Sequence, residues 1–84
     1  MEEKAREILN KLDTQLNGVE ALCKELHELG VSHSDDNKWN RSIGRLYVQS
    51  LSKSMASTDI PSMRSTMQII EDALNRKISY FSDN

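Results

Sequence analysis

Apolar side chains recur at helical spacing in three segments of the chain, and the first segment predicts a long helix. Its apolar positions follow one another at steps of 4, 3, 4, 3, 4 and 3, the heptad seam of a helix that packs lengthwise against another helix. The seam consists of Ala5, Leu9, Leu12, Leu16, Val19, Cys23 and Leu26. Three further side chains widen the apolar face: Ile8, Leu22 and Leu29. The spacing predicts a helix over about residues 2–29.

Two glycines stand at special positions of this first helix. Gly30 follows directly after the last apolar residue, where a glycine favours the end of a helix, and we expect it to be the C-cap. Gly18 lies in the interior, where glycine costs about 1 kcal/mol relative to alanine. It therefore indicates a bend or a close contact with another backbone.

The polar loop of residues 32–37 leads into a second helix, predicted over about residues 36–57. The loop ends in Asp36 and Asn37, which are good N-cap residues. The apolar positions of the helix are Trp39, Ile43, Leu46, Val48, Leu51 and Met55. Its polar positions follow at steps of 3, 4, 4 and 4, and so predict one stripe along the helix: Lys38, Arg41, Arg45, Gln49 and Lys53.

Residues 57–61 are expected to connect the second helix to a third, over about residues 60–80. Asp59 suits a cap and Pro61 suits a first turn. The apolar positions of the third helix are Ile60, Met63, Met67, Ile70, Leu74, Ile78 and Phe81. No strand pattern competes, so the sequence predicts one all-α domain over residues 1–84, a long helical hairpin plus a third, C-terminal helix. A chain this short has a marginal core, and its narrow seams favour assembly as an oligomer.

Composition narrows the setting and the chemistry. Cys23 is the single cysteine, so no disulfide forms within the chain, and the absence of a secretion signal favours the cytoplasm. No apolar run approaches the roughly 18 residues that span a bilayer, so we expect no membrane partner. His27 lies one turn from Cys23, but no third group orients a Cys–His pair. We therefore expect no enzyme.

We also expect no metal and no cofactor. The local cluster of His27, His33, Asp35 and Asp36 lacks a recognised ligand spacing. Loop and capping roles explain the last three of these residues better. No glycine-rich phosphate loop is present.

Charge is distributed unevenly along this acidic chain. The net charge is −2, yet residues 37–57 hold four basic residues and no acidic one. This positive charge is local, which suits a small anionic ligand or an acidic partner better than DNA, so no DNA binding is expected. One interpretation is a solvated face, or pairing with acids of the first helix. The other is an anion site, in which Gly44 leaves the backbone open beside Arg45 and Gln49 offers both a donor and an acceptor. Trp39 and Tyr47 would pack within the hairpin or stack on a base.

A longer pattern runs through the same segment. It comprises Lys38–Trp39, the run Ser42-Ile43-Gly44-Arg45, Gln49 four residues later and Pro61 a dozen further on. The pattern resembles the small phage proteins that defeat CBASS immunity by sequestering cyclic oligonucleotides, and it covers roughly residues 35–61. Asn40 and Arg41 together occupy one family position.

The resemblance implies a helical hairpin assembled into a compact hexamer of interlocked dimers. Such proteins bind cyclic dinucleotides such as 3′3′-cGAMP, and in some cases cyclic trinucleotides, between subunits without cleaving them. The ligand-binding residues would be Lys38, Trp39, Arg41, Gly44, Arg45, Tyr47, Gln49 and Lys53. Two alternatives remain open. One is a small helical phage adaptor that binds a host protein such as RNA polymerase, and the other is a small DNA-binding helical domain.

Overall fold

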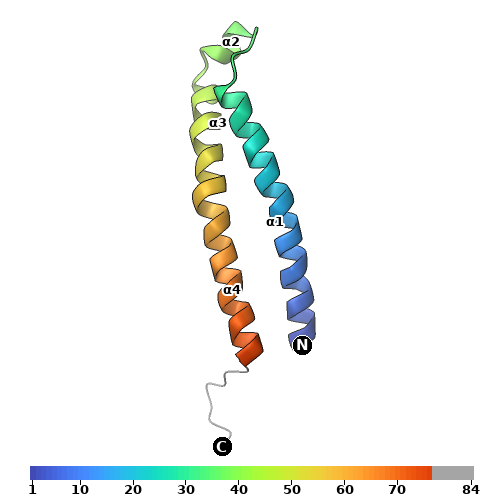
Figure 1. Ribbon diagram of the computed structural model, residues 1–84. Helices are drawn as coiled ribbons and strands as arrows, with labels where there is room; N and C mark the ends of the chain where they lie inside the picture. Colours follow the sequence, from blue (N-terminus) through green and yellow to red (C-terminus); the bar gives the residue numbers. More distant parts are fainter. Residues whose placement is uncertain (77–84) are drawn as a thin grey trace, which may run out of the picture.

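The structure, a computed structural model that describes residues 1–76, is a hairpin of two long antiparallel helical arms (Figure 1). The first arm is α1, Glu2–Val31. The second arm runs without a break through α3 (Ile43–Ser54), a π-helical segment η1 (Met55–Asp59) and α4 (Ile60–Arg76). A short helix, α2 (Asn37–Asn40), lies at the tip, where the chain reverses. The predicted all-α class is confirmed, and the described residues contain no strand.

The first predicted helix is confirmed, but its glycine has a different role. Gly30 lies inside α1 and is buried, whereas we expected it to end the helix. A Cβ placed on Gly30 would come within 2.7 Å of both Cα and N of Gln49. Glycine is therefore needed because α1 and α3 touch backbone to backbone at this level. At Gly18, in contrast, an added Cβ would meet nothing within 4 Å.

The second predicted helix is divided, so the expectation of one helix over residues 36–57 is wrong. Ser42 adopts an extended backbone, with φ −79° and ψ 146°, and its hydroxyl accepts a hydrogen bond from the Arg45 N–H at 3.0 Å. Ser42 is thus the N-cap of α3. Asp36 caps α2 as predicted, since its Oδ1 accepts from the N–H groups of Lys38 and Trp39.

Residues 57–61 are helical and do not form the expected connection. The Ile60 N–H donates to the carbonyl of Met55, five residues earlier, as in a π-helix. Buried or half-buried contact positions of the second arm recur at Arg45, Ser52, Ile60, Met67 and Leu74. The step from Ser52 to Ile60 is one residue longer than the others, and a π-turn absorbs such an extra residue without turning the contact face away.

The third helix begins at Ile60, as predicted. Its predicted end, with Ile78 and Phe81, lies outside the described residues.

The two arms share a small core. Leu16, Cys23 and Ile60 are buried and form one cluster, against which Ala56 and Met67 pack. The two arms lie side by side as a single layer of helices (Figure 1). Many large apolar side chains of both arms are therefore exposed within residues 1–76.

Polar side chains bridge the arms along one side of this core, which we name the polar edge. Near the open end, Arg6 Nε donates to Asn75 Oδ1 at 3.2 Å. In the middle, Arg64 bonds to Asp13 and to Asn17. Near the tip, His27 Nδ1 lies 2.8 Å from the carbonyl oxygen of Gln49. These contacts fix which sides of the two arms lie together.

We predict that Gly30→Ala destabilises the hairpin by about 1–3 kcal/mol, because the added methyl group forces the two backbones apart. Gly44→Ala is the matched control, since the nearest atom to its Cβ would be Ser42 Oγ at 3.7 Å. That control should change the free energy of unfolding by less than about 0.5 kcal/mol. Urea unfolding followed by circular dichroism measures both. Equal effects of the two substitutions would contradict the close approach at Gly30.

We also predict that the π-turn can be removed without loss of the fold. Deleting Thr58, which is exposed in η1, restores a seven-residue step across the segment, so the contact face should stay in register. Deleting Ser65 in α4 is the control, because it turns Met67 and Leu74 away from α1. The melting temperature should hold for the first deletion and fall by at least roughly 5 °C for the second.

Candidate functional site

The tip of the hairpin is organised around the last carbonyl groups of α1. Such carbonyls have no partner within their own helix. Here three of them accept from the chain that follows. Glu28 O accepts from the Ser32 N–H at 2.8 Å, and Leu29 O accepts from Trp39 Nε1 at 3.2 Å. Gly30 O accepts from Arg45 Nη1 at 2.7 Å. Trp39 therefore packs within the hairpin, at its tip, which is one of the two roles considered for it; the other was stacking on a base.

Arg45 joins three helices at this point. Besides the bond to Gly30 O, its Nε donates to Asn40 O at 3.0 Å, at the end of α2. The last turn of α1 contains no basic residue, so Arg45 supplies the positive charge that a helix C-terminus favours. The sequence predicted that this guanidinium binds an anionic ligand, yet its Nε and Nη1 donate to backbone carbonyls. Among residues 1–76, only its Nη2 is without a hydrogen-bond partner.

The predicted stripe of polar residues does not exist as one line. Lys38 lies on α2 and Arg41 in the turn before α3, and both are exposed. The break at Ser42 separates them from Gln49 and Lys53, which lie further along α3 on the polar edge. The remaining predicted site residues, Gly44 and Tyr47, also lie on α3 but away from that edge. The tip thus gathers Lys38, Trp39, Arg41, Gly44 and Arg45, and Tyr47 follows Gly44 by one turn of α3. Gln49 and Lys53 lie apart from this group.

The start of α3 has the local features of an anion site. The N–H groups of Ile43 and Gly44 belong to the first turn and have no partner among the described residues. No acidic residue lies in that turn, and Gly44 leaves its backbone open. The N-terminus of a helix attracts anions, and the exposed cations Lys38 and Arg41 precede it in the chain. Tyr47, which is 60% exposed, follows Gly44 by one turn.

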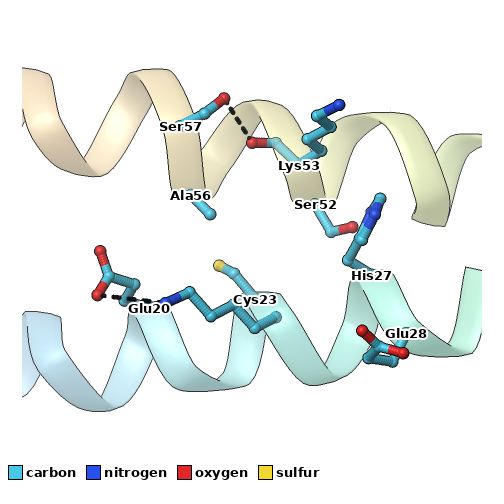
Figure 2. A pocket seen from close by; sticks show the side chains of 9 residues that line it. Glu20, Cys23, His27, Glu28, Ser52, Lys53, Ala56 and Ser57 are labelled. Carbon is cyan, nitrogen blue, oxygen red and sulfur yellow. Dashed lines mark hydrogen bonds and ion pairs between the residues drawn. The ribbon is translucent and has the colours of Figure 1, made fainter.

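A groove on the polar edge is a concave feature that Lys53, one of the predicted residues, helps to line (Figure 2). Cys23 and Ala56 form its apolar floor, and Figure 2 shows the Cys23 sulfur directed toward the second arm. Charged and polar side chains of both arms surround it: Glu20, Lys24, His27, Glu28, Ser52, Lys53 and Ser57. The Lys53 ammonium is directed away from α1 (Figure 2). Acids and bases are mixed here, so the groove shows no preference for an anion.

The Cys–His pair considered from sequence is not assembled in this groove. Cys23 is only 4% exposed, and no hydrogen bond joins it to His27 within residues 1–76. His27 Nδ1 must donate to Gln49 O, because a carbonyl only accepts, which leaves Nε2 as the acceptor of the neutral ring. No group of three His, Cys, Asp or Glu side chains in the described part of the chain could hold a metal ion. The absence of catalysis stays a prediction.

Two residues with structural roles at the site, Ser42 and Ser52, were missed from the sequence. Ser42 carries a signal that N-cap rules could have found, since its side chain can satisfy an N–H three residues on. Ser52 is 1% exposed, and its hydroxyl donates to the Val48 carbonyl of its own helix. No local sequence pattern predicts the burial of Ser52 or the contact of His27 with the Gln49 carbonyl, because both depend on how the arms pack.

Comparison with protein-family models, with curated proteins and with solved structures finds no match to this chain. The resemblance to the CBASS-evading proteins therefore rests on the residues of segment 35–61 themselves. None of the described helices is both long and apolar enough to cross a membrane.

We predict that Arg45→Met lowers the free energy of unfolding by about 1.5–3 kcal/mol, because two helix-end carbonyls lose a charged donor. Arg45→Lys should recover only part of this, since one ammonium cannot reproduce the planar fork that reaches both carbonyls. Arg41→Met, at an exposed position, is the control and should cost less than about 0.5 kcal/mol. Urea denaturation of the three variants measures the differences. An effect of Arg45→Met no larger than the control would refute the bridging role.

Proposed function

We propose that this chain is a phage anti-defence protein that binds cyclic oligonucleotide second messengers at its tip and sequesters them without cleavage. The ligands would be cyclic dinucleotides such as 3′3′-cGAMP, and the effect would be to suppress CBASS immunity in the host cytoplasm. The observation that carries the proposal is the open start of α3. There, two free N–H groups and a bare Gly44 follow the exposed cations Lys38 and Arg41.

The binding mode follows from the chemistry of these groups. A phosphate would accept hydrogen bonds from the N–H groups of Ile43 and Gly44, and Arg41 would add a bidentate charged contact. Arg45 would act mainly by holding α3 in place, with Nη2 as its free donor. Tyr47 has an exposed face on which a base can stack. No cluster that could hold a metal ion lies among residues 1–76, and sequestration needs none.

One tip offers one such phosphate site, whereas a cyclic dinucleotide has two phosphates. A complete binding site would therefore require the tips of at least two copies, which agrees with the predicted homo-oligomer. A shared site also explains how a hairpin with so small a core could enclose a ligand. The hexamer implied by the resemblance is one such assembly.

The test is isothermal titration calorimetry with a panel of cyclic dinucleotides and trinucleotides. We expect at least one ligand to bind, and the double substitution Lys38→Gln, Arg41→Gln to weaken its affinity by at least roughly tenfold. The control is Lys4→Gln with Arg76→Gln, which removes the same charge at the opposite end of the hairpin. Gly44→Ala should weaken binding while the fold is kept.

The ligand is then recovered by denaturing the complex and separated by chromatography. Recovery of the intact ring supports sequestration, and recovery of a linear dinucleotide contradicts it. No binding by any cyclic ligand, or equal losses in the tip variant and its charge control, would reject the proposed site.

A second candidate function is a helical adaptor that docks on a host protein such as RNA polymerase. It is favoured by the large apolar side chains that both arms expose, for example Leu22 at 63% and Leu51 at 56%. The two functions respond to different substitutions. An adaptor should lose its partner in lysate pull-downs with Leu22→Glu and keep it with the tip variant, whereas nucleotide binding should show the tip dependence.

A further inference from the structure

The exposed apolar side chains of α1 lie on one side of its line of contact with the second arm. The contact positions recur every seventh residue, at Leu9, Leu16 and Cys23. Three residues after each stands an exposed apolar side chain: Leu12, Val19 and Leu26. Four residues after each stands a polar one: Asp13, Glu20 and His27. With 3.6 residues per turn, these two sets flank the contact line on opposite sides.

The second arm obeys the same rule. Three residues after the contact positions Ile60 and Met67 stand exposed Met63 and Ile70, and four residues after them stand polar residues, the first of which is Arg64. Arg64 pairs with Asp13 of α1, so the polar flanks of the two arms lie on the same side. The apolar flanks must then lie together on the other side.

We name this other side the apolar face. On α1 it comprises Ile8, Leu12, Val19, Leu22, Leu26 and Leu29, and on the second arm Leu51, Met55, Met63 and Ile70. Each of these side chains is between 39% and 63% exposed. Together they offer an area on the order of the 800 Å² that each partner buries in a standard protein interface.

The spacing on α1 makes this face complementary to itself. With Gln15 included, the positions from Ile8 to Leu29 follow at steps of 4, 3, 4, 3, 4 and 3, a second heptad seam beside the one that packs within the hairpin. Its midpoint falls between Gly18 and Val19. An antiparallel copy that overlaps the whole seam therefore crosses it at Gly18, whose missing side chain has no purpose within the hairpin.

Charges about this midpoint are complementary as well. Lys11 and Glu25 lie seven residues before and seven residues after Gly18, at the outer margin of the apolar face. Neither forms an ion pair with another described residue. In an antiparallel copy centred at Gly18, Lys11 would face Glu25 of the other chain, and the symmetry makes this pair twice. A parallel copy would instead set like charges side by side.

The apolar residues of the second arm are centred at the level of Gly18 as well. Arg64 lies level with Asp13 and Asn17, and Gln49 lies level with Gly30, so Gly18 stands opposite the region of Ile60. The apolar pairs Leu51 with Ile70, and Met55 with Met63, are centred on or next to Ile60. One two-fold axis at the height of Gly18 thus relates the apolar residues of both arms to themselves.

From these observations we infer that a second copy of this chain docks antiparallel on the apolar face, about a two-fold axis level with Gly18. The product is a four-helix bundle with the two tips at opposite ends. A self-complementary patch is what a two-fold interface requires, and nothing in an unrelated partner would explain the shared centre of spacing and charge. This interface does not depend on nucleotide binding.

We predict that the protein is a dimer or a multiple of it by size-exclusion chromatography with light scattering, and that Leu22→Glu makes it monomeric. Lys11→Glu should raise the dimer dissociation constant by roughly tenfold, because it creates two like-charge pairs, and adding Glu25→Lys should restore it. Lys24→Glu, toward the polar edge, is the charge control and should leave the constant unchanged. A monomer at millimolar concentration, or a double variant no better than Lys11→Glu, would overturn the interface.

Disulfide trapping tests the direction of the two chains. In a Cys23→Ala background, Leu12→Cys and Leu26→Cys are mixed and oxidised, since antiparallel chains bring these positions within the roughly 7 Å between Cα atoms that a disulfide needs. The mixture should give a covalent dimer, and each variant alone should not. Ser57→Cys, on the polar edge, is the control and should stay uncrosslinked. Crosslinking of each variant with itself would instead indicate a parallel arrangement and overturn the proposal.

These outcomes are separable from the fate of the proposed function. A dimer that binds no cyclic nucleotide would reject the sponge and keep the interface. A protein that is monomeric without ligand, and whose copies join only at their tips around a cyclic nucleotide, would do the reverse. Capture of one specific host protein by a monomer through Leu22 would also overturn this interface, and would favour the adaptor.

Discussion

The hairpin depends on how the last turn of α1 is closed. Three successive carbonyls there accept from the Ser32 N–H, the Trp39 indole and the Arg45 guanidinium. These hydrogen bonds hold the returning chain to the end of α1 at the tip of the hairpin. A core of three buried apolar side chains supplies little free energy to hold two long arms together. These hydrogen bonds set which residues of α3 lie level with the last turn of α1, and Gly30 allows the two backbones to touch there. Packing along the rest of the hairpin follows from that register.

The second constraint is that the hairpin is a single layer of two helical arms. Its surface therefore has a polar flank and an apolar flank. Each arm can bury only one narrow line of side chains against the other, and the flanks of that line carry the remaining pattern. On one flank, Arg6, Arg64 and His27 bridge the arms through bonds that do not require a third helix. On the other flank, apolar side chains of both arms remain exposed, and only another layer of protein would remove them from water. The chain therefore looks like half of a two-layer structure.

Local sequence patterns predicted most of the helices and failed where contact between the arms decides. The heptad seam of α1, the cap at Asp36 and the start of α4 at Ile60 all have signals within a few residues. The eight-residue step from Ser52 to Ile60 has no such local signal, because a loop and a π-turn both accommodate one extra residue. The presence of Pro61 favoured the loop interpretation. Gly30 was misread for a similar reason: a glycine after the last apolar position suits both a helix end and a backbone crossing.

Of the predicted site, Lys38, Trp39, Arg41, Gly44 and Arg45 do lie together at the tip. The division of the stripe at Ser42 has a local signal, the N-cap, that was overlooked. The use of Arg45 as a structural cation depends on a carbonyl of α1 that no pattern within residues 36–57 contains.

The two proposals constrain each other. If two chains pack antiparallel about Gly18, their tips point in opposite directions, and one dimer cannot close both phosphates of a cyclic dinucleotide within a single site. The ring must then join tips of different dimers, so sequestration and assembly beyond the dimer become one event. Exposed apolar side chains that do not belong to the apolar face gather at the start of α3, where Ile43 is 69%, Tyr47 60% and Leu46 54% exposed. Contact between tips would cover these side chains and place Arg41 and Gly44 of two dimers around the same ligand. A sponge built this way would hold its ligand in a site that exists only where dimers meet, which is how a chain with almost no interior of its own could exclude water from a charged ring.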